Sequence, residues 1–447
     1  MGGFGHTLLG MRALRLDWRW WWMALPLACG AAEIPEPVLP AGVGVNIHFV
    51  TGQEKDLDLL AAAGFKFVRM DFDWTGTETS KGQYTWQAYD ELLANLDRRG
   101  LRAVLILDYS HPFYEETVTS PNPMTQAPYK NTASPRHPES IAAYARWAAA
   151  AARHYAGRHV IWEIWNEPNG NFWSPKPDAE QYTALALAAC RAIRQADPQA
   201  TVVAPATSGF PWEYLETFLK SGVLEYLDAV SVHPYRSPRQ PPETAAGDYR
   251  KLRALIDRQA SPARRGRVPI LSGEWGYSTC TRGVSLENQA AFAARQQLAN
   301  LYSGIPLSIW YDWKNDGNDA NENEHNFGTV LPDLQPKPAY RAVQTLTRQL
   351  AGYRILRRLP LPEDKDYVLV CAGPAGANKL AAWTLGEPHW IRLGLRATGS
   401  NPLSAVSSEG ASFSPKLDSS QLLLELGAAP QYVALADARL AEPGAQR

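Results

Sequence analysis

Two glutamates, each beside a tryptophan, could carry out acid–base chemistry together. Residues 165–168 read Trp-Asn-Glu-Pro and residues 273–276 read Gly-Glu-Trp-Gly, and each motif follows a short apolar run. Each motif therefore places one carboxylate, Glu167 or Glu274, where a buried strand is expected to give way to a loop. Two carboxylates at the same end of one barrel can cleave a glycosidic bond.

Such a pair works only if its members differ in protonation state. Glu167 is the better acid, because Trp165 and Pro168 beside it are expected to exclude water and favour its neutral form. Glu274 is the better nucleophile, provided that hydrogen-bond donors hold it in its charged form. A gap of ~5–5.5 Å between the carboxyl groups retains the sugar configuration and ~6.5–9.5 Å inverts it, and the sequence leaves this choice open.

Eight apolar runs alternate with stretches of helical period, and these elements must position the two glutamates. The runs are 42–49, 65–72, 102–108, 160–165, 201–205, 229–233, 268–272 and 307–311. The helical stretches between them are 56–63, 87–99, 141–154, 179–196, 212–221, 249–259 and 287–301. This order predicts an α/β fold, a closed (β/α)₈ TIM barrel of parallel strands. An open doubly wound sheet is the alternative, but the glycine-rich phosphate turn that usually follows its first strand is missing.

The pattern of predicted secondary structure changes after the last predicted helix, 338–349. Short strands are predicted at 367–372, 379–385, 390–395, 421–426 and 433–435, separated by Pro, Gly and Ser. This pattern indicates a small β-sandwich. We therefore expect a leader over residues 1–32, a catalytic barrel over 33–350 and a sandwich domain over 351–447.

The leader has the order of a secretory signal peptide. Arg12, Arg15 and Arg19 precede the apolar stretch 20–32, which is too short to span a bilayer comfortably. The expected location is periplasmic or in the cell envelope. An uncleaved leader is the alternative, and it would associate the protein with the membrane.

Composition and the remaining motifs exclude several functions. The net charge of −1 and the absence of basic patches argue against nucleic acid as a partner. After the leader, Cys190, Cys280 and Cys371 form neither a disulfide framework nor a metal cluster. The acidic connection 312–328 matches no calcium loop, and no phosphate loop or zinc helix is present. We expect no metal and no cofactor.

The glutamate motifs resemble those of the barrel glycoside hydrolases that retain configuration. Residues 162–169 (Trp-Glu-Ile-Trp-Asn-Glu-Pro-Asn) and 337–340 (Lys-Pro-Ala-Tyr) are most similar to glycoside hydrolase family 39, and family 5 shares much of the pattern. The resemblance implies that Glu167 is the acid/base and Glu274 the nucleophile. The leader, the length and the C-terminal domain resemble hydrolases of bacterial exopolysaccharide operons, which implies a polysaccharide substrate cleaved within the chain.

The resemblance also implies roles for residues around the pair. Asn166 resembles the asparagine that binds the sugar 2-hydroxyl, and His233 and Tyr235 resemble residues that orient the nucleophile. Arg69 resembles an arginine that keeps the nucleophile ionised. Glu163 is expected to play a structural hydrogen-bonding role.

Further polar and aromatic side chains follow predicted strands and are candidates for binding sugar. The polar candidates are His48, Asp71, Asp108 and His111. The aromatic candidates, which would stack on pyranose faces, are Trp173, Trp275, Trp310 and Trp313.

The predicted function is that of an exported, monomeric, retaining endo-glycoside hydrolase acting on a bacterial exopolysaccharide. A β-xylosidase or a β-glucan or β-mannan hydrolase on the same scaffold is the first alternative. The second is a carbohydrate-binding protein that kept the barrel without its catalysis.

Overall fold

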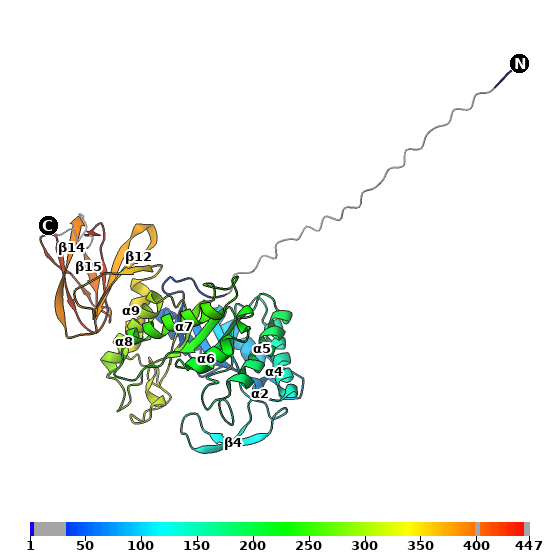
Figure 1. Ribbon diagram of the computed structural model, residues 1–447. Helices are drawn as coiled ribbons and strands as arrows, with labels where there is room; N and C mark the ends of the chain where they lie inside the picture. Colours follow the sequence, from blue (N-terminus) through cyan, green and yellow to red (C-terminus); the bar gives the residue numbers. More distant parts are fainter. Residues whose placement is uncertain (4–32, 398–402, 442–447) are drawn as a thin grey trace. The chain divides into compact units, whose positions relative to one another are not determined.

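A computed structural model of the chain describes residues 1–3, 33–397 and 403–441 (Figure 1). Apart from its first three residues, the predicted leader lies outside the described part of the chain. Within that part, no helix combines the length and the apolar character that crossing a bilayer demands.

Eight parallel strands close into a barrel, which confirms the predicted fold. They are β1 (Val43–Asn46), β2 (Phe67–Asp73), β3 (Arg102–Asp108), β6 (Ile161–Ile164), β7 (Thr201–Ser208), β8 (Ala229–His233), β9 (Ile270–Trp275) and β10 (Ser308–Trp310). All neighbouring pairs are parallel, and β10 closes the barrel against β1.

One long helix follows each barrel strand. The helices are α1 (Glu54–Ala63), α3 (Gln87–Asp97), α4 (Pro138–His154), α5 (Ala179–Ala196), α6 (Trp212–Leu219), α7 (Ala245–Gln259), α8 (Leu286–Tyr302) and α9 (Pro338–Gln349). Local chemistry sets several of their ends. The Asp178 carboxylate caps α5 by accepting from the backbone N–H groups of Glu180 and Gln181, and Gly64 ends α1 at a positive φ of 86°.

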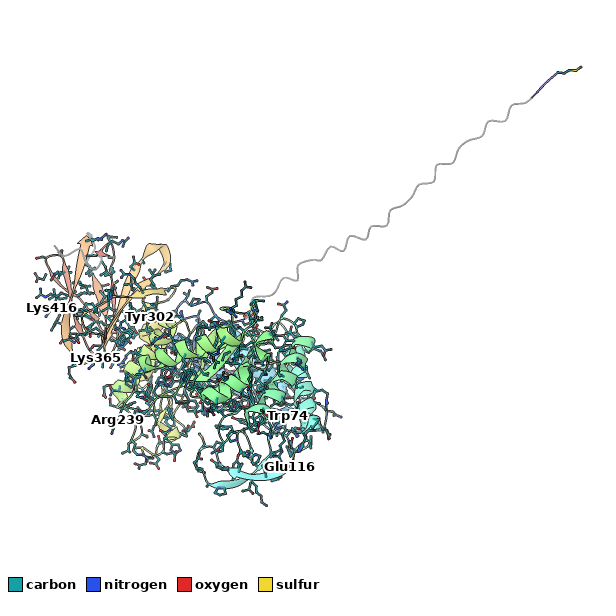
Figure 2. All side chains as sticks on the ribbon, viewed as in Figure 1. Trp74, Glu116, Arg239, Tyr302, Lys365 and Lys416 are labelled. Atoms are coloured by element: carbon teal, nitrogen blue, oxygen red, sulfur yellow. The ribbon has the colours of Figure 1, made fainter. Side chains whose placement is uncertain are left out.

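The packed core has an outer layer between strands and helices and an inner layer inside the barrel. In the outer layer Trp74, labelled in Figure 2, stacks on Trp147 with ring centroids 5.4 Å apart. The inner layer consists of Phe67, Val104, Ile161, Val203, Ala229, Leu271, Leu307 and Ile309.

On three strands, the inward-pointing residue two positions after this apolar layer is polar. Arg69 follows Phe67 on β2, Glu163 follows Ile161 on β6, and Ser231 follows Ala229 on β8. The barrel interior is therefore apolar near the amino ends of its strands and polar toward their carboxyl ends, where barrel active sites lie.

Two antiparallel sheets follow the barrel and pack around a second apolar core. One sheet contains β11 (Arg354–Arg358), β12 (Asp366–Ala372), β13 (Asn378–Thr384), β19 (Gln431–Ala434), β15 (Ser404–Val406) and β16 (Ser412–Phe413). The other contains β17 (Lys416–Asp418), β18 (Gln421–Leu426), β14 (His389–Ala397) and β20 (Arg439–Leu440). Their shared core, which includes Val368, Leu380, Leu422 and Leu424, is that of a β-sandwich. The division into separate domains at residue 350 stays a prediction.

A buried ion pair joins the barrel helices to these sheets. Glu243, in the 3₁₀ turn η2 (Pro242–Thr244), accepts from Arg295 Nε over 2.8 Å and from Arg295 Nη2 over 2.7 Å. Trp383 of β13 donates its indole N–H to the same carboxylate over 2.8 Å. Arg295 also donates to the carbonyl of Ala428 over 3.2 Å.

The long connection after β3 contains a hairpin that the sequence did not predict. Strands β4 (Thr117–Pro121) and β5 (Pro128–Thr132) pair antiparallel and project beyond the barrel helices (Figure 1).

Candidate active site

Arg69 is the centre of a buried polar network at the carboxyl ends of the strands. Its guanidinium donates to Glu163 and Glu274, each over 2.6 Å, to Asn166 over 2.9 Å and to Asn46 over 3.2 Å. Burial by itself would lower the pKa of Arg69, but the charges of Glu163 and Glu274 raise it above its ordinary value. Arg69 is therefore a permanent cation that fixes side chains from three other strands or strand ends.

Both carboxylate oxygens of Glu274 accept hydrogen bonds. Oε2 accepts from Arg69, and Oε1 accepts from the hydroxyl of Tyr235 over 2.8 Å. Burial and then the charge of Glu274 raise the pKa of Tyr235 well above its ordinary value, so the phenol stays a donor. Donors from two different strand ends therefore hold both oxygens of the Glu274 carboxylate.

Glu167 has a different environment. Its Oε1 lies 3.0 Å from Nδ1 of His233, whose other ring nitrogen, Nε2, lies 3.4 Å from Arg69 Nη2. Since a guanidinium only donates, Nε2 of His233 must accept and Nδ1 must carry the proton that it donates to Glu167. Oε2 is then the oxygen of Glu167 that can carry a proton for transfer.

The two glutamates converge on one point. Oxygens of Glu167 and Glu274 and a ring nitrogen of His233 all lie within 4.8 Å of one another. This limit joins the nearest oxygens of the two carboxyl groups, and it fits the ~5–5.5 Å separation of retaining enzymes better than the ~6.5–9.5 Å of inverting ones. The geometry therefore matches the retaining arrangement.

The backbone that presents Glu167 is strained. Trp165 has a φ of 67° and Glu167 a φ of 46°, in the left-handed region that these residue types rarely occupy. Each such residue costs on the order of 1–3 kcal/mol. The N–H of Glu167 donates to the carbonyl of Ala206 over 3.0 Å, at a position where β7 has an extra residue relative to β8. The strained turn brings both Asn166 and Glu167 into the Arg69 network.

A bulge in β9 presents Glu274. Ser272 pairs with Ser308 and Trp275 with Trp310, so β9 has one residue more than β10 in this interval. A Cβ on Gly273 would lie 2.3 Å from Ser231 Oγ and 3.0 Å from Glu163 Oε1. Gly273 thus points inward like its neighbour Glu274, and the space beside it holds the polar network instead of a side chain.

A cavity of about 410 Å³ opens over the glutamate pair. Five aromatic side chains contribute to its wall, and they come from four separate loops or strand ends. They are Tyr109, Phe172, Tyr235, Tyr311 and Phe327.

Several predicted site residues meet at this cavity. Glu167, Glu274, His48, Arg69, Asn166 and Tyr235 line it, and His233 lies buried beneath Glu167. Glu163 accepts from Arg69 and from Ser231 Oγ, over 2.6 and 2.5 Å, which fits its predicted structural role.

The four tryptophans predicted to stack on sugar are fully buried instead. Trp173 packs on Trp165, and Trp275 and Trp310 both pack on Tyr277 in the outer layer. None of these three lines the cavity.

The fourth, Trp313, donates its indole N–H to Asp56 over 2.8 Å. It borders a smaller neighbouring cavity of about 260 Å³ that shares Asn46 and His48 with the first.

Strand alternation explains where the tryptophans lie. Leu307 and Ile309 of β10 point into the barrel, so Trp310 points outward and Tyr311 points inward again. The aromatic wall at this strand end is therefore a tyrosine.

His111 also lies apart from the cavity. Its Nε2 bonds to the carbonyl of Glu78 over 2.9 Å, and its Nδ1 accepts from the backbone of Phe113 over 3.1 Å. The ring packs edge-on against Trp74. These contacts orient the loop that follows β3, so His111 lies in the core of that loop and not in the wall of the cavity.

The sequence analysis did not identify Asn46, Ser231 and Tyr311 as residues of the site. Asn46 and Ser231 occupy inward positions beside Arg69 and Glu163, and an alternation count from the apolar inner layer would have identified both.

Comparison with known proteins agrees with this geometry. Residues 37–322 match the cellulase family, glycosyl hydrolase family 5. The chain belongs to this family. The predicted resemblance to the barrel glycoside hydrolases is confirmed.

A β-xylosidase of Caldicellulosiruptor saccharolyticus is 26% identical to this glycosyl hydrolase over 267 residues, which cover 54% of this chain and 52% of that protein. The chain thus spans about half the length of this curated relative.

Solved structures share the fold. A family 39 glycoside hydrolase from the gut symbiont Bacteroides cellulosilyticus WH2 superposes with a TM-score of 0.74 at 24% identity, covering 90% of this chain and 81% of that one. A monomeric β-xylosidase from Caulobacter crescentus CB15 superposes with a TM-score of 0.62 at 17% identity, covering 88% and 95%.

Proposed function

We propose that this glycosyl hydrolase is a retaining endo-glycosidase that cleaves a bacterial exopolysaccharide by double displacement. The observation that carries the proposal is the convergence of Glu167 and Glu274 oxygens within 4.8 Å, in two unlike environments. One carboxylate is held by a cation and a phenol, and the other faces a histidine N–H.

In the first step Glu274 attacks the anomeric carbon while Glu167 gives its proton to the departing glycosidic oxygen. Arg69 and Tyr235 hold the Glu274 carboxylate in place. The bond to the leaving sugar breaks as the ester bond between the anomeric carbon and Glu274 forms.

In the second step Glu167, now ionised, takes a proton from a water molecule. The resulting hydroxide equivalent attacks the anomeric carbon and releases Glu274. Two inversions give net retention of configuration. The mechanism needs no metal, and His233 supports Glu167 in both of its protonation states through one hydrogen bond.

Cleavage within a chain is favoured by the cavities beside the catalytic one. The catalytic cavity shares Asp71 and Tyr109 with a larger cavity of about 790 Å³, and it shares Asn46 and His48 with the smaller one. Three adjoining cavities suit a polymer that continues on both sides of the scissile bond, whereas an exo-acting enzyme needs a pocket closed at one end.

The test is digestion of a glycan panel that includes bacterial exopolysaccharides, read by mass spectrometry and by proton NMR of the first product anomer. We expect oligosaccharides and retained configuration. Glu167→Gln and Glu274→Gln should each abolish release of reducing ends, while Glu213→Gln, on the exposed first turn of α6, should not. Wild-type activity in both catalytic variants would refute the assignment.

A β-xylosidase activity is the second candidate, favoured by the curated relative named above. Xylose as the sole product from xylo-oligosaccharides would support it against the endo-acting proposal. Binding across the panel without any cleavage by the wild-type protein would instead support a carbohydrate-binding role.

We also propose that the protein is exported and acts as a monomer in the periplasm or cell envelope. The order of charged and apolar residues in the leader supports export. Fractionation of cells expressing the full chain, with mass spectrometry of its N-terminus, tests both the location and the cleavage of the leader.

A further inference from the structure

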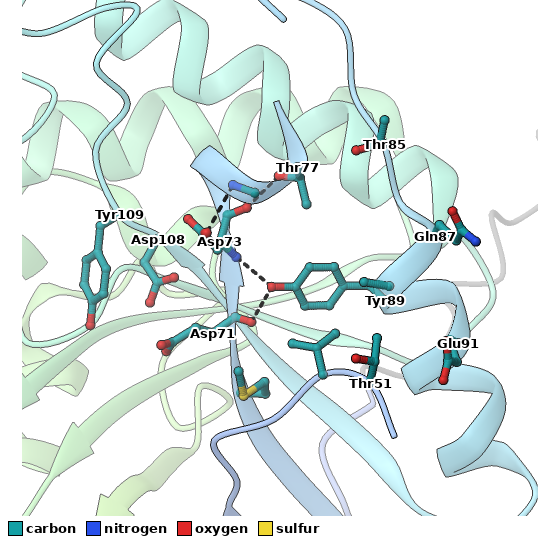
Figure 3. Close-up of a pocket in the computed structure, with 14 residues that line it drawn as sticks. Thr51, Asp71, Asp73, Thr77, Thr85, Gln87, Tyr89, Glu91, Asp108 and Tyr109 are labelled. Carbon is teal, nitrogen blue, oxygen red and sulfur yellow. Dashed lines mark hydrogen bonds between the residues drawn. The ribbon is translucent and has the colours of Figure 1, made fainter. Parts of the chain in front are cut away.

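A cavity of about 790 Å³ adjoins the catalytic cavity and has its own polar floor (Figure 3). It lies at the carboxyl ends of β2 and β3, beside α3 and the short helix α2 (Trp74–Thr77). Asp71 and Tyr109 belong to the walls of both cavities. A ligand chain can therefore pass from one cavity to the other.

Asp108 lies on the floor of this larger cavity and is only 1% exposed. Among the described residues, no N–H or hydroxyl group donates to either of its carboxylate oxygens, and the side chain within hydrogen-bonding range of it is that of Asp71. Burial and then the charge of Asp71 raise the pKa of Asp108 well above its ordinary value. Figure 3 shows the side chains of Asp71 and Asp108 next to each other, between Tyr109 and Asp73.

The cavity wall carries negative groups and no positive one. Its four carboxylates belong to Asp71, Asp73, Glu91 and Asp108, and no Lys, Arg or His of the described part of the chain lines it. Asp73 is already used, because it caps α2 by accepting from the backbone of Thr75 and Gly76.

Glu91 is exposed at the rim, so Asp71 and Asp108 form the inner pair. Two cations act on this pair from outside the wall, and both have other partners. Arg69 is committed to its own four acceptors, and His48 pairs with Asp312 and Asp316.

A buried carboxylate that no cation contacts directly is costly, and a positive ligand group beside Asp108 would relieve that cost. The rest of the wall suits a pyranose. Thr51, Thr85 and Gln87 offer neutral polar groups for hydroxyls, and Val50 and Met70 offer apolar surface.

We propose that this cavity is a subsite for a sugar residue that carries a protonated amine, held by Asp71 and Asp108. The inference rests on the proposed glycosidase function and specifies its substrate as a polysaccharide containing amino sugars that are not acetylated. The ammonium group donates to the two carboxylates, and the sugar chain continues past Asp71 and Tyr109 toward Glu167 and Glu274.

Binding is measured by isothermal titration calorimetry in a Glu167→Gln background, so that cleavage does not consume the probe. The probes are the pentasaccharide of β-1,4-linked glucosamine, its fully N-acetylated counterpart and cellopentaose. We expect the glucosamine probe to bind at least tenfold more tightly than the other two. Asp108→Asn and Asp71→Asn should each remove most of that preference.

Glu54→Gln, an equal loss of charge on the exposed start of α1, is the matched control and should keep the preference. Thermal unfolding of each variant separates lost binding from lost folding. Equal affinity for the three probes, or an unchanged preference in folded Asp108→Asn, would overturn the inference. So would a preference that appears only with added calcium and disappears in chelator, because the cation would then be a metal. None of these binding measurements depends on turnover. Failure of the amino-sugar subsite can therefore be distinguished from failure of the glycosidase assignment.

Discussion

Arg69 Nη1 lies 2.6 Å from Oε2 of Glu274, and through Nε the same guanidinium lies 2.6 Å from Oε2 of Glu163. One buried cation thus serves two carboxylates at once, of which one is the proposed nucleophile and the other lies within the barrel. The planar fork of arginine permits this double contact, and the single ammonium of lysine does not.

Arg69→Lys should therefore lower kcat/KM by about 10²–10³, comparable to the loss of a transition-state donor. It should also lower stability, because one buried carboxylate loses its partner. Steady-state kinetics and thermal unfolding check both effects. Arg354→Lys, in an exposed pair with Glu36, should leave both values nearly unchanged. Wild-type kcat/KM in Arg69→Lys would contradict the proposal that the guanidinium must contact both carboxylates.

Tyr235→Phe removes the donor to Glu274 Oε1 and keeps the ring in the cavity wall. A hydrogen bond to a charged group contributes ~1.5–3 kcal/mol, which corresponds to roughly a 10- to 150-fold fall in kcat. The midpoint of thermal unfolding should change little. Tyr302→Phe, on the exposed end of α8, is the control. An unchanged kcat would show that Glu274 does not need its second donor.

Gly273→Ala should disturb the network, since the new methyl group would lie 2.3 Å from Ser231 Oγ. Overpacking of this kind costs about 1–3 kcal/mol, and the displaced Glu163 should reduce activity as well. The double variant Gly273→Ala with Ser231→Ala should recover part of the loss, because the closest atom is gone. Gly427→Ala, which meets no atom within 4 Å, should be neutral. Equal defects in the single and double variants would count against this contact as the cause.

Glu243→Gln should loosen the junction between α8, η2 and the C-terminal strands. Breaking a buried pair costs about 3–5 kcal/mol, and the amide cannot satisfy Arg295 and Trp383 as a carboxylate does. Urea denaturation should show the loss, while kcat at 25 °C stays near wild type because the catalytic cavity is untouched. Glu363→Gln, at an exposed position, is the control. A large fall in kcat without a fall in stability would contradict a purely structural role.

His48 should make stability depend on pH. Burial lowers its pKa, but the hydrogen bond to Asp316 and the charge of Asp312 raise the pKa to about 9 from an ordinary value of 6.5. Because the folded pKa exceeds the unfolded one, the stabilising contribution is complete below about pH 6.5 and disappears as the pH rises through 9.

The Tm of the wild type should therefore fall relative to that of His48→Gln between pH 6.5 and 9. The difference should be modest, since the side chain is 40% exposed. Parallel curves of Tm against pH would show that the ion pair contributes nothing measurable.

The sequence predicted the architecture well because barrel strands are apolar on both faces and are bounded by turns. The predicted bounds of β3, β8 and α5 agree with the structure. The position of the candidate catalytic pair was accessible for the same reason, since a carboxylate directly after such a run lies at the rim of the barrel.

Because these strands are apolar on both faces, the sequence did not reveal which side chains point into the barrel and which point toward the helices. Without knowing which positions point inward, the sequence analysis chose Trp310 for the wall and missed Tyr311 beside it. Gly273 within a strand pattern was the one local sign of the bulge, and it does not say which way Glu274 points. The β4–β5 hairpin was hidden too, because the proline-rich composition around Pro121 and Pro128 is typical of an irregular loop.

One extra residue in β9 sets the direction in which Glu274, the proposed nucleophile, points. If this segment paired with β10 without the extra residue, the position after the inward-pointing Gly273 would face the helical shell, and the Glu274 carboxylate would turn away from the cavity. An engineer who grafts this pair onto another eight-stranded scaffold must therefore transplant the irregular segment together with its glycine. A homologue that pairs the same segment in plain alternation would keep both glutamates and still point one of them away from the substrate.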